Sequence, residues 1–531
     1  MPTIQSKVNI NSLAFQTNYE LMKAKVEELN KLLEESLFQG EEKHIERAKK
    51  EGKLLARERM DLLLDQDSPL LDLLPLAGFA RNCFTLGSTL IAGIGLVENK
   101  LCMIVANVAT VKGGAIEHVA VQKTKRLNDI AFENKLPVIY LVESAGANLP
   151  DQVNIFNLGG NNFLEITKRS KHKIPTIAVV FGNSTAGGAY IPGMCDYVIM
   201  VKGKAKLFLA GPPLVKMATG EITDDETLGG AETHSKISGV SDFLAQNEEH
   251  AISIARDIVK NLNIDNNPVS QKKAKEPQYS ADEILGIVST DVKKTFDVRE
   301  VIARFSDDSE FTEFKPDYGT TLITGYAHIH GYQVGIIANN GVLFSEAANK
   351  GTQFIQLCDK NRTPLLFIQN ITGFMVGKKY EHEGIVKHGA NMINAVSNRS
   401  VPAITLIIGS SYGAGNYAMC GRAYNPRFLF TWPNSKIAVM GGEQAAGVME
   451  IIQRQAAEKT KATLDEASIA AMKEKLISKM ENESNAFFAS GQLWDDGVID
   501  PRETRNYLGF CLGIIHNNFP EYEGDYGVFR M

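Results

Sequence analysis

The chain has 531 residues and a formal net charge of −6 at pH 7, and hydrophobic residues make up 44% of it. That length is too great for one hydrophobic core and fits two domains with helical extensions, while the negative balance offers no basic field for nucleic acid. No apolar run approaches the roughly 20 residues that cross a bilayer, and the six scattered cysteines include no CxxC pair. We therefore expect a cytoplasmic protein with neither a nucleic-acid nor a membrane partner.

The first segment is predicted to be helical. Leucines at helical spacing among mixed charges run from about Asn11 to Leu64, which is the pattern of amphipathic helices. A packing or assembly arm is the simplest role for this segment. A second charged, helical region follows Met440, so that helical extensions are expected at both ends of the chain.

Between these extensions the pattern changes to short strands, helices and glycine turns. An amphipathic helix is predicted over 119–135, and the strand 137–144 follows it and ends in the small-residue turn Ser144-Ala145-Gly146-Ala147. A further β-branched run ends at Thr185-Ala186-Gly187-Gly188-Ala189, after which a helix can begin. The expected unit is therefore strand, glycine turn and helix.

The same order recurs later in the chain at a constant spacing. Pro137 and Pro364 lie 227 positions apart, and so do Gly187 and Ala414, whereas the strand pair upstream recurs at 232. The second copy of the central turn is Tyr412-Gly413-Ala414-Gly415-Asn416. Because self-similarity at a fixed spacing indicates repeated structure, we predict two homologous α/β domains.

A polar segment separates the two copies. Residues 264–283 contain proline, lack hydrophobic periodicity and form the natural linker, so we place the domains at residues 1–275 and 276–531. Two glycine-rich stretches of the first domain, 207–223 and 228–245, are too long for tight connections. They are predicted to be binding loops.

The glycine turns suggest one oxyanion hole in each domain. A strand that ends in small residues before a helix exposes main-chain N–H groups, which stabilise a developing negative oxygen. Gly187 with Gly188, and Ala414 with Gly415, occupy corresponding positions. The alternative is that the glycines merely punctuate turns, but the second copy in register favours the functional interpretation.

Other chemical motifs are absent from the sequence. It contains no GxxxxGK[ST] phosphate loop and no GxSxG nucleophile elbow. Glu381-His382-Glu383 with His388 matches no strong metal-ligand spacing, so we predict no metal site. A chain without a side-chain catalyst fits an enzyme whose bound cofactor performs the acid–base chemistry while the protein supplies oriented backbone donors.

Several motifs resemble those of the carboxyltransferase (β) subunits of biotin-dependent acyl-CoA carboxylases. They include TAGGAYIPGM, FLAGPPLVKMATGE, QNITGFMVG and the block SYGAGNYAMCGRAYNPRFLFTWPNSKIAVMGGEQAA, and they span nearly the whole chain. Within the family, the chain is most similar to methylcrotonyl-CoA carboxylase β. The resemblance implies two crotonase-like domains of the ClpP/crotonase superfamily and a ligase of leucine catabolism that carboxylates 3-methylcrotonyl-CoA.

The resemblance also implies roles for the two turns. Gly187 and Gly188 would hold the enolate oxygen of the acyl-CoA thioester, and Ala414 and Gly415 would hold the ureido oxygen of biotin. The N-terminal domain would bind acyl-CoA, and the C-terminal domain of a second subunit would bind carboxybiotin. The residues expected to bind substrate or cofactor around these turns are Ala145, Gly146, Ala186, Phe374, Gly413 and Tyr417, of which the two aromatic residues could equally serve packing.

Partners follow from the same resemblance. A separate biotin carboxylase and biotin carrier (α) subunit would hold biotin covalently and use ATP and bicarbonate, in an alpha6beta6 assembly with active sites at β–β dimer interfaces. The segment after Ala147, which lies near the acyl end of the site in relatives, departs from close methylcrotonyl enzymes and leaves geranyl-, propionyl- and longer-chain acyl-CoA open as substrates. A biotin-dependent decarboxylase subunit and a non-catalytic assembly scaffold are further alternatives.

Overall fold

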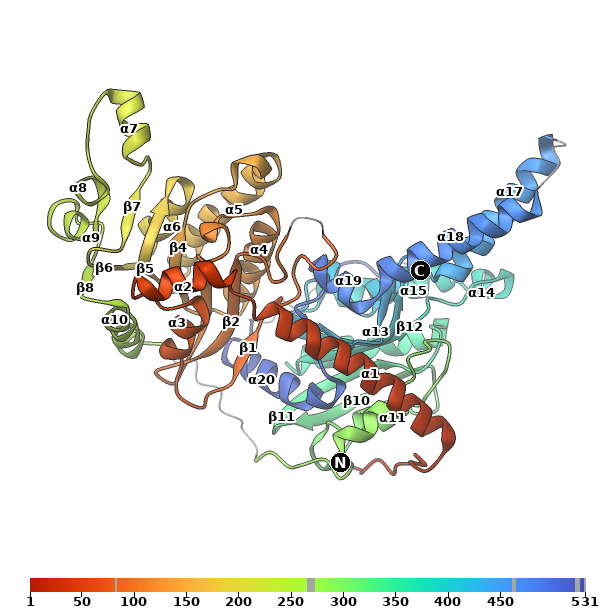
Figure 1. Cartoon of the computed structure of the whole chain (residues 1–531). Helices are drawn as coiled ribbons and strands as arrows, with labels where there is room; N and C mark the ends of the chain where they lie inside the picture. Colours follow the sequence, from red (N-terminus) through yellow and green to blue (C-terminus); the bar gives the residue numbers. More distant parts are fainter. Residues whose placement is uncertain (82–83, 265–272, 461–464, 521–525, 530–531) are drawn as a thin grey trace. The chain divides into compact units, whose positions relative to one another are not determined.

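The described residues form two compact units (Figure 1). One, the N-terminal unit, comprises Leu33–Pro268, and the other, the C-terminal unit, comprises Met1–Leu32 and Val269–Met531. The middle of the predicted linker, residues 265–272, lies outside the described residues. The computed structural model describes all of the chain except residues 82–83, 265–272, 461–464, 521–525 and 530–531.

The N-terminal unit is built on an eight-stranded sheet. Its strands follow the order β1-β2-β3-β4-β5-β6-β8, and β7 pairs with the end of β5. The pairs β1–β2 and β2–β3 are antiparallel, and the pairs from β3 onward are parallel. The strands are β1 (Leu70–Asp72), β2 (Leu90–Val97), β3 (Lys100–Asn107), β4 (Val138–Ser144), β5 (Thr176–Thr185), β6 (Tyr197–Val201), β7 (Lys206–Phe208) and β8 (Phe243–Ala245).

Helices cover the parallel part of this sheet. Every residue of β4 is buried, as expected for a parallel strand that is covered on both faces. One covering helix, α4, buries Val119, Leu127 and Ile130 from its apolar stripe. The helices of this unit are α2 (Glu42–Lys50), α3 (Ala56–Leu63), α4 (His118–Glu133), α5 (Gln152–Lys171), α6 (Tyr190–Gly193), α7 (Pro212–Thr219), α8 (Asp225–Gly229), α9 (Ala231–Thr233) and α10 (Glu248–Asn261).

The C-terminal unit repeats this sheet. Its order is β16-β14-β13-β12-β11-β10-β9, with β15 paired to β13. The pairs β9–β10 and β10–β11 are antiparallel and the others are parallel. The strands are β9 (Thr312–Glu313), β10 (Leu322–Ile329), β11 (Tyr332–Asn339), β12 (Leu365–Ile371), β13 (Ala403–Tyr412), β14 (Phe428–Thr431), β15 (Lys436–Ala438) and β16 (Gly497–Val498).

The C-terminal unit also carries the longer terminal helices. The helix α1 (Leu13–Ser36) begins in this unit, and α17 and α18 follow the second sheet as the predicted C-terminal helical extension (Figure 1). The other helices are α11 (Ile284–Ile287), α12 (Val298–Ile302), α13 (Ser345–Lys360), α14 (Lys378–His382), α15 (Ile385–Asn398), α16 (Gly413–Ala418), α17 (Gly442–Thr460), α18 (Glu466–Ser484), α19 (Ala486–Gly491) and α20 (Thr504–Asn517).

The two units match element for element. The elements α4, β4 and β5 recur as α13, β12 and β13, displaced by 227 positions at both ends of each element. The hairpins β2–β3 and β10–β11 recur at 232, and both turn through two residues of positive φ, Glu98-Asn99 and His330-Gly331, as two-residue hairpins prefer. The five extra residues of the N-terminal unit lie between Asn107 and His118. The predicted pair of α/β folds is confirmed.

The structure adds detail to two local predictions. The N-terminal helical segment is three helices, α1, α2 and α3, because Gly40 and Gly52 adopt φ values of 118° and 64° between them, which a helix interior does not allow. The predicted binding loops contain the short helices α7, α8 and α9, and Pro212-Pro213 favours the start of α7. Among the described residues, no helix combines the length and apolar character that crossing a membrane requires.

Candidate active site

The first glycine turn directly follows β5. The strand ends at Thr185, Ala186 adopts a φ of 53°, and the chain enters a short 3-10 helix, η3 (Ala186–Ala189), before α6. A residue in the left-handed region turns the chain sharply from strand to helix. The first N–H groups of a helix have no hydrogen-bond acceptor within the helix. This turn therefore offers main-chain donors of the kind that an oxyanion needs.

Neither glycine of this turn is required by the fold. Gly187 and Gly188 do not have positive φ. A Cβ on Gly187 would come no closer than 3.9 Å to the ring of Phe163, and one on Gly188 no closer than 3.9 Å to the Cα of Gly146, which is ordinary van der Waals contact. The missing side chains therefore leave the turn open to the approach of a ligand.

The second predicted turn of this unit lies against the first. Gly146 has a φ of 87°, and a Cβ on it would come within 3.1 Å of the carbonyl oxygen of Thr185. The Ser144 hydroxyl accepts a hydrogen bond of 3.2 Å from the Gly146 N–H. At the carboxyl ends of β4 and β5, the structure thus brings together Ala145, Gly146, Ala186, Gly187 and Gly188.

A cavity of about 510 Å³ opens beside these turns. It lies between one face of the sheet and the helices α4 and α5, and Gly187 and Gly188 form part of its wall. Most of its lining is apolar, with Leu90, Val105 and Val142 contributed by three neighbouring strands. Such a mostly apolar cavity with a few convergent polar groups is typical of sites for small organic ligands.

Sequence reasoning missed most of this wall. Alternate residues of a strand share one face, and Tyr140, Val142 and Ser144 of β4 all line the cavity. The two-residue alternation along β4 could therefore have predicted these cavity residues from the sequence. The segment after Ala147 supplies Phe156 and Phe163 of α5 to the same cavity.

A buried ion cluster supports β4 and β5 just before the turns. Arg59 is only 2% exposed and donates hydrogen bonds of 2.8 Å to Glu143 and to Glu248, and Lys53 donates to Glu143 at 2.9 Å. Burial raises the pKa of Glu143, but Arg59 and Lys53 outweigh burial and hold the pKa below its usual value. A Cβ on Gly182 would meet the Glu143 carboxylate at 2.4 Å, so the cluster packs directly on β5.

The second copy of the turn begins with the same φ but has different reasons for its glycines. Gly413 has a φ of 53° and begins α16 directly after β13. A Cβ on Gly415 would meet Ile371 at 2.6 Å, so conformation explains the first glycine and packing explains the second. The first N–H groups of α16, including that of Ala414, likewise have no acceptor within the helix.

Phe374 and Tyr417 have different surroundings. The ring of Phe374 lies 3.1 Å from the position of a Cβ on Gly389 and packs against the core of the C-terminal unit. Tyr417 is 46% exposed, as is its N-terminal counterpart Tyr190, and its ring centroid lies 5.7 Å from that of Tyr424. Packing accounts for Phe374, whereas Tyr417 is accessible beside the turn of α16.

The space that corresponds to the cavity is occupied in the C-terminal unit. Leu322 and Ile337, the counterparts of the cavity residues Leu90 and Val105, belong to a buried apolar cluster that also contains Met392. The duplicated halves therefore offer different spaces next to similar turns.

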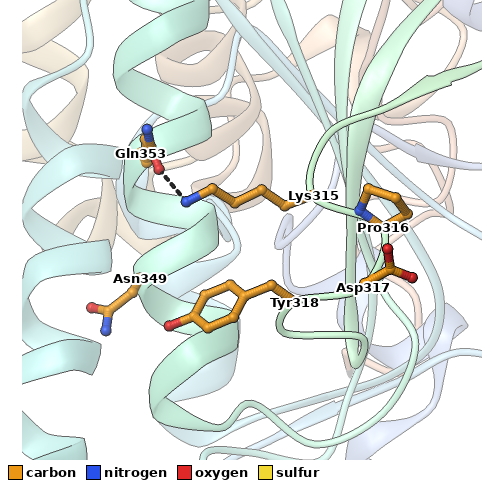
Figure 2. Close-up of a pocket in the computed structure, with 6 residues that line it drawn as sticks. All are labelled: Lys315, Pro316, Asp317, Tyr318, Asn349 and Gln353. Atoms are coloured by element: carbon orange, nitrogen blue, oxygen red, sulfur yellow. Dashed lines mark hydrogen bonds between the residues drawn. The ribbon is translucent and has the colours of Figure 1, made fainter.

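A separate hollow of about 440 Å³ lies on the C-terminal unit (Figure 2). Residues 315–318 form one side, and Asn349 and Gln353 of α13 form the other. Lys315 donates a hydrogen bond of 2.6 Å to Gln353 across it, and Figure 2 shows the ring of Tyr318 directed toward Asn349. None of the residues predicted from the sequence lines this hollow. In the described part of the chain, no three His, Cys, Asp or Glu side chains are grouped as a metal site would need.

With this geometry in view, comparison with known proteins identifies the family. Residues 47–521 match the model of the carboxyl transferase domain. The chain belongs to the carboxyl transferase family. This carboxyltransferase is 54% identical to a probable biotin-dependent acyl-coenzyme A carboxylase beta2 subunit of Mycobacterium tuberculosis, over 99% of this chain and 100% of that protein. It is 47% identical to a probable methylcrotonoyl-CoA carboxylase beta chain of Drosophila melanogaster, over 99% of this chain and 95% of that one.

A solved structure agrees with these relatives. The β subunit of geranyl-CoA carboxylase from P. aeruginosa matches this carboxyltransferase with a TM-score of 0.91 and 43% identity, over 99% of both chains. The predicted carboxyltransferase subunit with two crotonase-like halves and helical termini is thereby confirmed.

Proposed function

We propose that this carboxyltransferase transfers a carboxyl group from biotin, held by a partner subunit, to the acyl group of an acyl-CoA. The observation that carries the proposal is the cavity of about 510 Å³ whose wall includes Gly187 and Gly188. An apolar cavity beside main-chain donors suits a thioester whose hydrocarbon chain enters the cavity while its oxygen meets the turn.

The two turns take complementary parts in this proposal. The amides of Gly187 and Gly188 stabilise the thioester oxygen as negative charge develops on it, and each such donor contributes about 3 kcal/mol of transition-state stabilisation. The amides that open α16, those of Ala414 and Gly415, would hold the ureido oxygen of biotin, and the exposed Tyr417 would border that site. Bound carboxybiotin supplies the carboxyl group and the base that activates the acyl carbon.

The acyl group proposed first is 3-methylcrotonyl. Three relatives support it. Proteins named methylcrotonoyl-CoA carboxylase beta chain in Drosophila melanogaster, Dictyostelium discoideum and Arabidopsis thaliana are 47–48% identical to this chain over 99% of its length. That assignment would place the enzyme in leucine degradation.

Geranyl-CoA is the second candidate, and the size of the cavity favours it. A five-carbon acyl group would leave much of the roughly 510 Å³ cavity empty. The wall includes Gly159 and Gly160 of α5, and a Cβ on Gly160 would meet nothing within 4 Å. A longer branched chain would fill this space, and the solved relative with a TM-score of 0.91 is a geranyl-CoA carboxylase β subunit.

We further propose that the chain acts as an oligomer with a biotin-carrying α subunit that uses ATP and bicarbonate, in an alpha6beta6 assembly. On α5, Val153 is 86% and Phe156 is 82% exposed, and on α7, Met217 is 77% exposed. Val153 and Phe156 lie three positions apart on α5, and exposed apolar side chains that gather on one helix suit a contact with a second subunit. The proposed active site then joins the acyl-CoA site of one β subunit to the biotin site of another.

The test is reconstitution with the biotin-carrying subunit. Purified chain, partner, ATP and labelled bicarbonate are incubated with 3-methylcrotonyl-, geranyl-, propionyl- or long-chain acyl-CoA, and acid-stable label is counted. We expect label in the 3-methylcrotonyl or geranyl product. If no acyl-CoA acquires label although the partner's biotin becomes carboxylated, the proposed function is wrong.

A further inference from the structure

A buried polar network borders the acyl cavity. The side chain of Arg169 on α5 is 0% exposed and donates hydrogen bonds to the Asn128 side-chain oxygen at 2.7 Å and to the Tyr140 hydroxyl at 2.5 Å. Asn128 in turn donates to the side-chain oxygen of Asn162 at 3.0 Å. Among the described residues, no carboxylate pairs with Arg169. Asn128, Tyr140 and Asn162 all line the cavity.

The fold does not need this network. At the positions displaced by 227, the C-terminal unit has Val396 for Arg169, Phe367 for Tyr140 and Ile355 for Asn128, and all three belong to its apolar core. The same helices and strands therefore pack with hydrocarbon side chains alone. Burying a guanidinium without a carboxylate costs several kcal/mol that polar neighbours only partly recover, so a role beyond packing is indicated.

The network lies at the end of the cavity that is farthest from the turns. Ser144 lies at the turn end of β4, and Tyr140 is four residues earlier on the same face, which corresponds to about 13 Å along the strand. On α4, Ala120 and Asn128 both line the cavity, and eight residues correspond to about 12 Å along a helix. A group bound here is thus roughly 12 Å from the turn that would hold the thioester.

The Nε–H of Arg169 is buried without an acceptor among the described residues, and two further hydrogen-bond donors of this network are also unused. The Tyr140 oxygen accepts from Arg169, but among the described residues no acceptor takes the hydroxyl hydrogen of Tyr140. Asn162 accepts a hydrogen bond through its side-chain oxygen, and its side-chain N–H groups have no acceptor among the residues that the structure describes. The positive charge of Arg169 polarises the hydroxyl and strengthens it as a donor.

We propose that the end of the cavity farthest from the turns recognises an oxygen acceptor, which is a hydroxyl, carbonyl or carboxylate at the far end of the acyl group. Tyr140 and Asn162 bind this oxygen, and Arg169 is a positioning residue that fixes them and supplies positive charge. The inference rests on the proposed function, and it makes oxygenated, branched acyl-CoA thioesters the preferred substrates of this site.

The test compares matched substrates in the complex with the biotin-carrying subunit. Geranyl-CoA is compared with derivatives that carry a hydroxyl or a carboxylate on the carbon farthest from the thioester. We expect kcat/KM at least tenfold higher for the oxygenated derivatives. A greater gain for the carboxylate than for the hydroxyl would show that the charge of Arg169 contributes. Equal or higher kcat/KM for plain geranyl-CoA would overturn the proposal.

Variants separate recognition from structure. Tyr140→Phe, which copies Phe367, should bring the ratio of oxygenated to plain kcat/KM close to one, and Arg169→Met should reduce it most for the carboxylate. Ser170→Ala, next to Arg169 but outside the cavity wall, should keep the wild-type ratio. An unchanged ratio in Tyr140→Phe would mean that the network is only structural. If the complex carboxylates no acyl-CoA, the proposed function is wrong, but the inference can still be tested by binding. Calorimetry should then give a Kd at least tenfold lower for the oxygenated derivatives than for geranyl-CoA, and equal Kd values would overturn the inference.

Discussion

Ala186 and Gly413 share a φ of 53° at the same step from strand to helix, 227 positions apart. The repeat is therefore preserved in the backbone even where the side chains differ. An L-residue in this region is strained by roughly 1 kcal/mol, whereas glycine is not. The N-terminal turn accepts this strain without a glycine, which indicates that the geometry of the turn is over-determined by its surroundings.

Exchanging glycine and alanine at these two positions should change the free energy of unfolding differently. Gly413→Ala should lower the free energy of unfolding by about 1–2 kcal/mol, because the new Cβ is both strained and only 3.0 Å from the Val439 carbonyl oxygen. Ala186→Gly should not destabilise, since it removes strain. Urea denaturation of both variants checks this, and a larger loss in Ala186→Gly than in Gly413→Ala would contradict it.

The buried ion cluster should be costly to break. Arg59→Met leaves the Glu143 and Glu248 carboxylates buried without their main partner, so we expect the free energy of unfolding to fall by about 3–5 kcal/mol. Arg47→Met is the matched control, because the Arg47–Glu51 pair is exposed and contributes at most about 1 kcal/mol. Similar losses in the two variants would show that the cluster does not support the sheet.

Stability should depend on pH through Asp495. Burial raises the pKa of this carboxyl from its ordinary 3.8 to about 6. Because the folded state holds the proton more tightly than the unfolded one, this residue lowers stability as the pH rises from about 4 to about 6, and the loss is complete above the folded pKa.

Asp495→Asn removes this titration. Its stability advantage over the wild type should be about 1 kcal/mol greater at pH 8 than at pH 5, as measured by denaturant unfolding at both values. Asp496→Asn is the control, since it weakens a charged hydrogen bond from Arg422 and should destabilise at both pH values. An advantage of Asp495→Asn that does not change with pH would exclude the proposed titration.

The sequence predicted the duplication and the two turns because proline, β-branched runs and glycine fix local backbone at recognisable spacing. The register of 227 positions predicted that β4 recurs as β12, and the repeated order of elements predicted a second helix at α13 without fixing its ends. Local patterns also placed Gly146 and Gly187 at strand ends, where the structure joins them.

Contacts between elements that are distant in the sequence could not be predicted from local patterns. Tyr140, Asn128 and Arg169 come from different elements and meet only when α4 and α5 cover the sheet. Nothing local distinguishes Tyr140 from Phe367, yet one lines a cavity and the other fills a core. The breaks at Gly40 and Gly52 were missed because helical periodicity continues across them.

The most direct test of the account is turnover by Gly188→Ala in the reconstituted complex. The added methyl group meets only ordinary contacts in the protein, so the unfolding midpoint should equal that of the wild type, while the methyl intrudes where the thioester oxygen must approach. We expect carboxyl transfer to fall on the order of 100-fold, and Gly193→Ala, which lies on α6 with nothing within 4 Å, should retain it. Wild-type transfer by Gly188→Ala would contradict the assignment of this turn as the oxyanion hole.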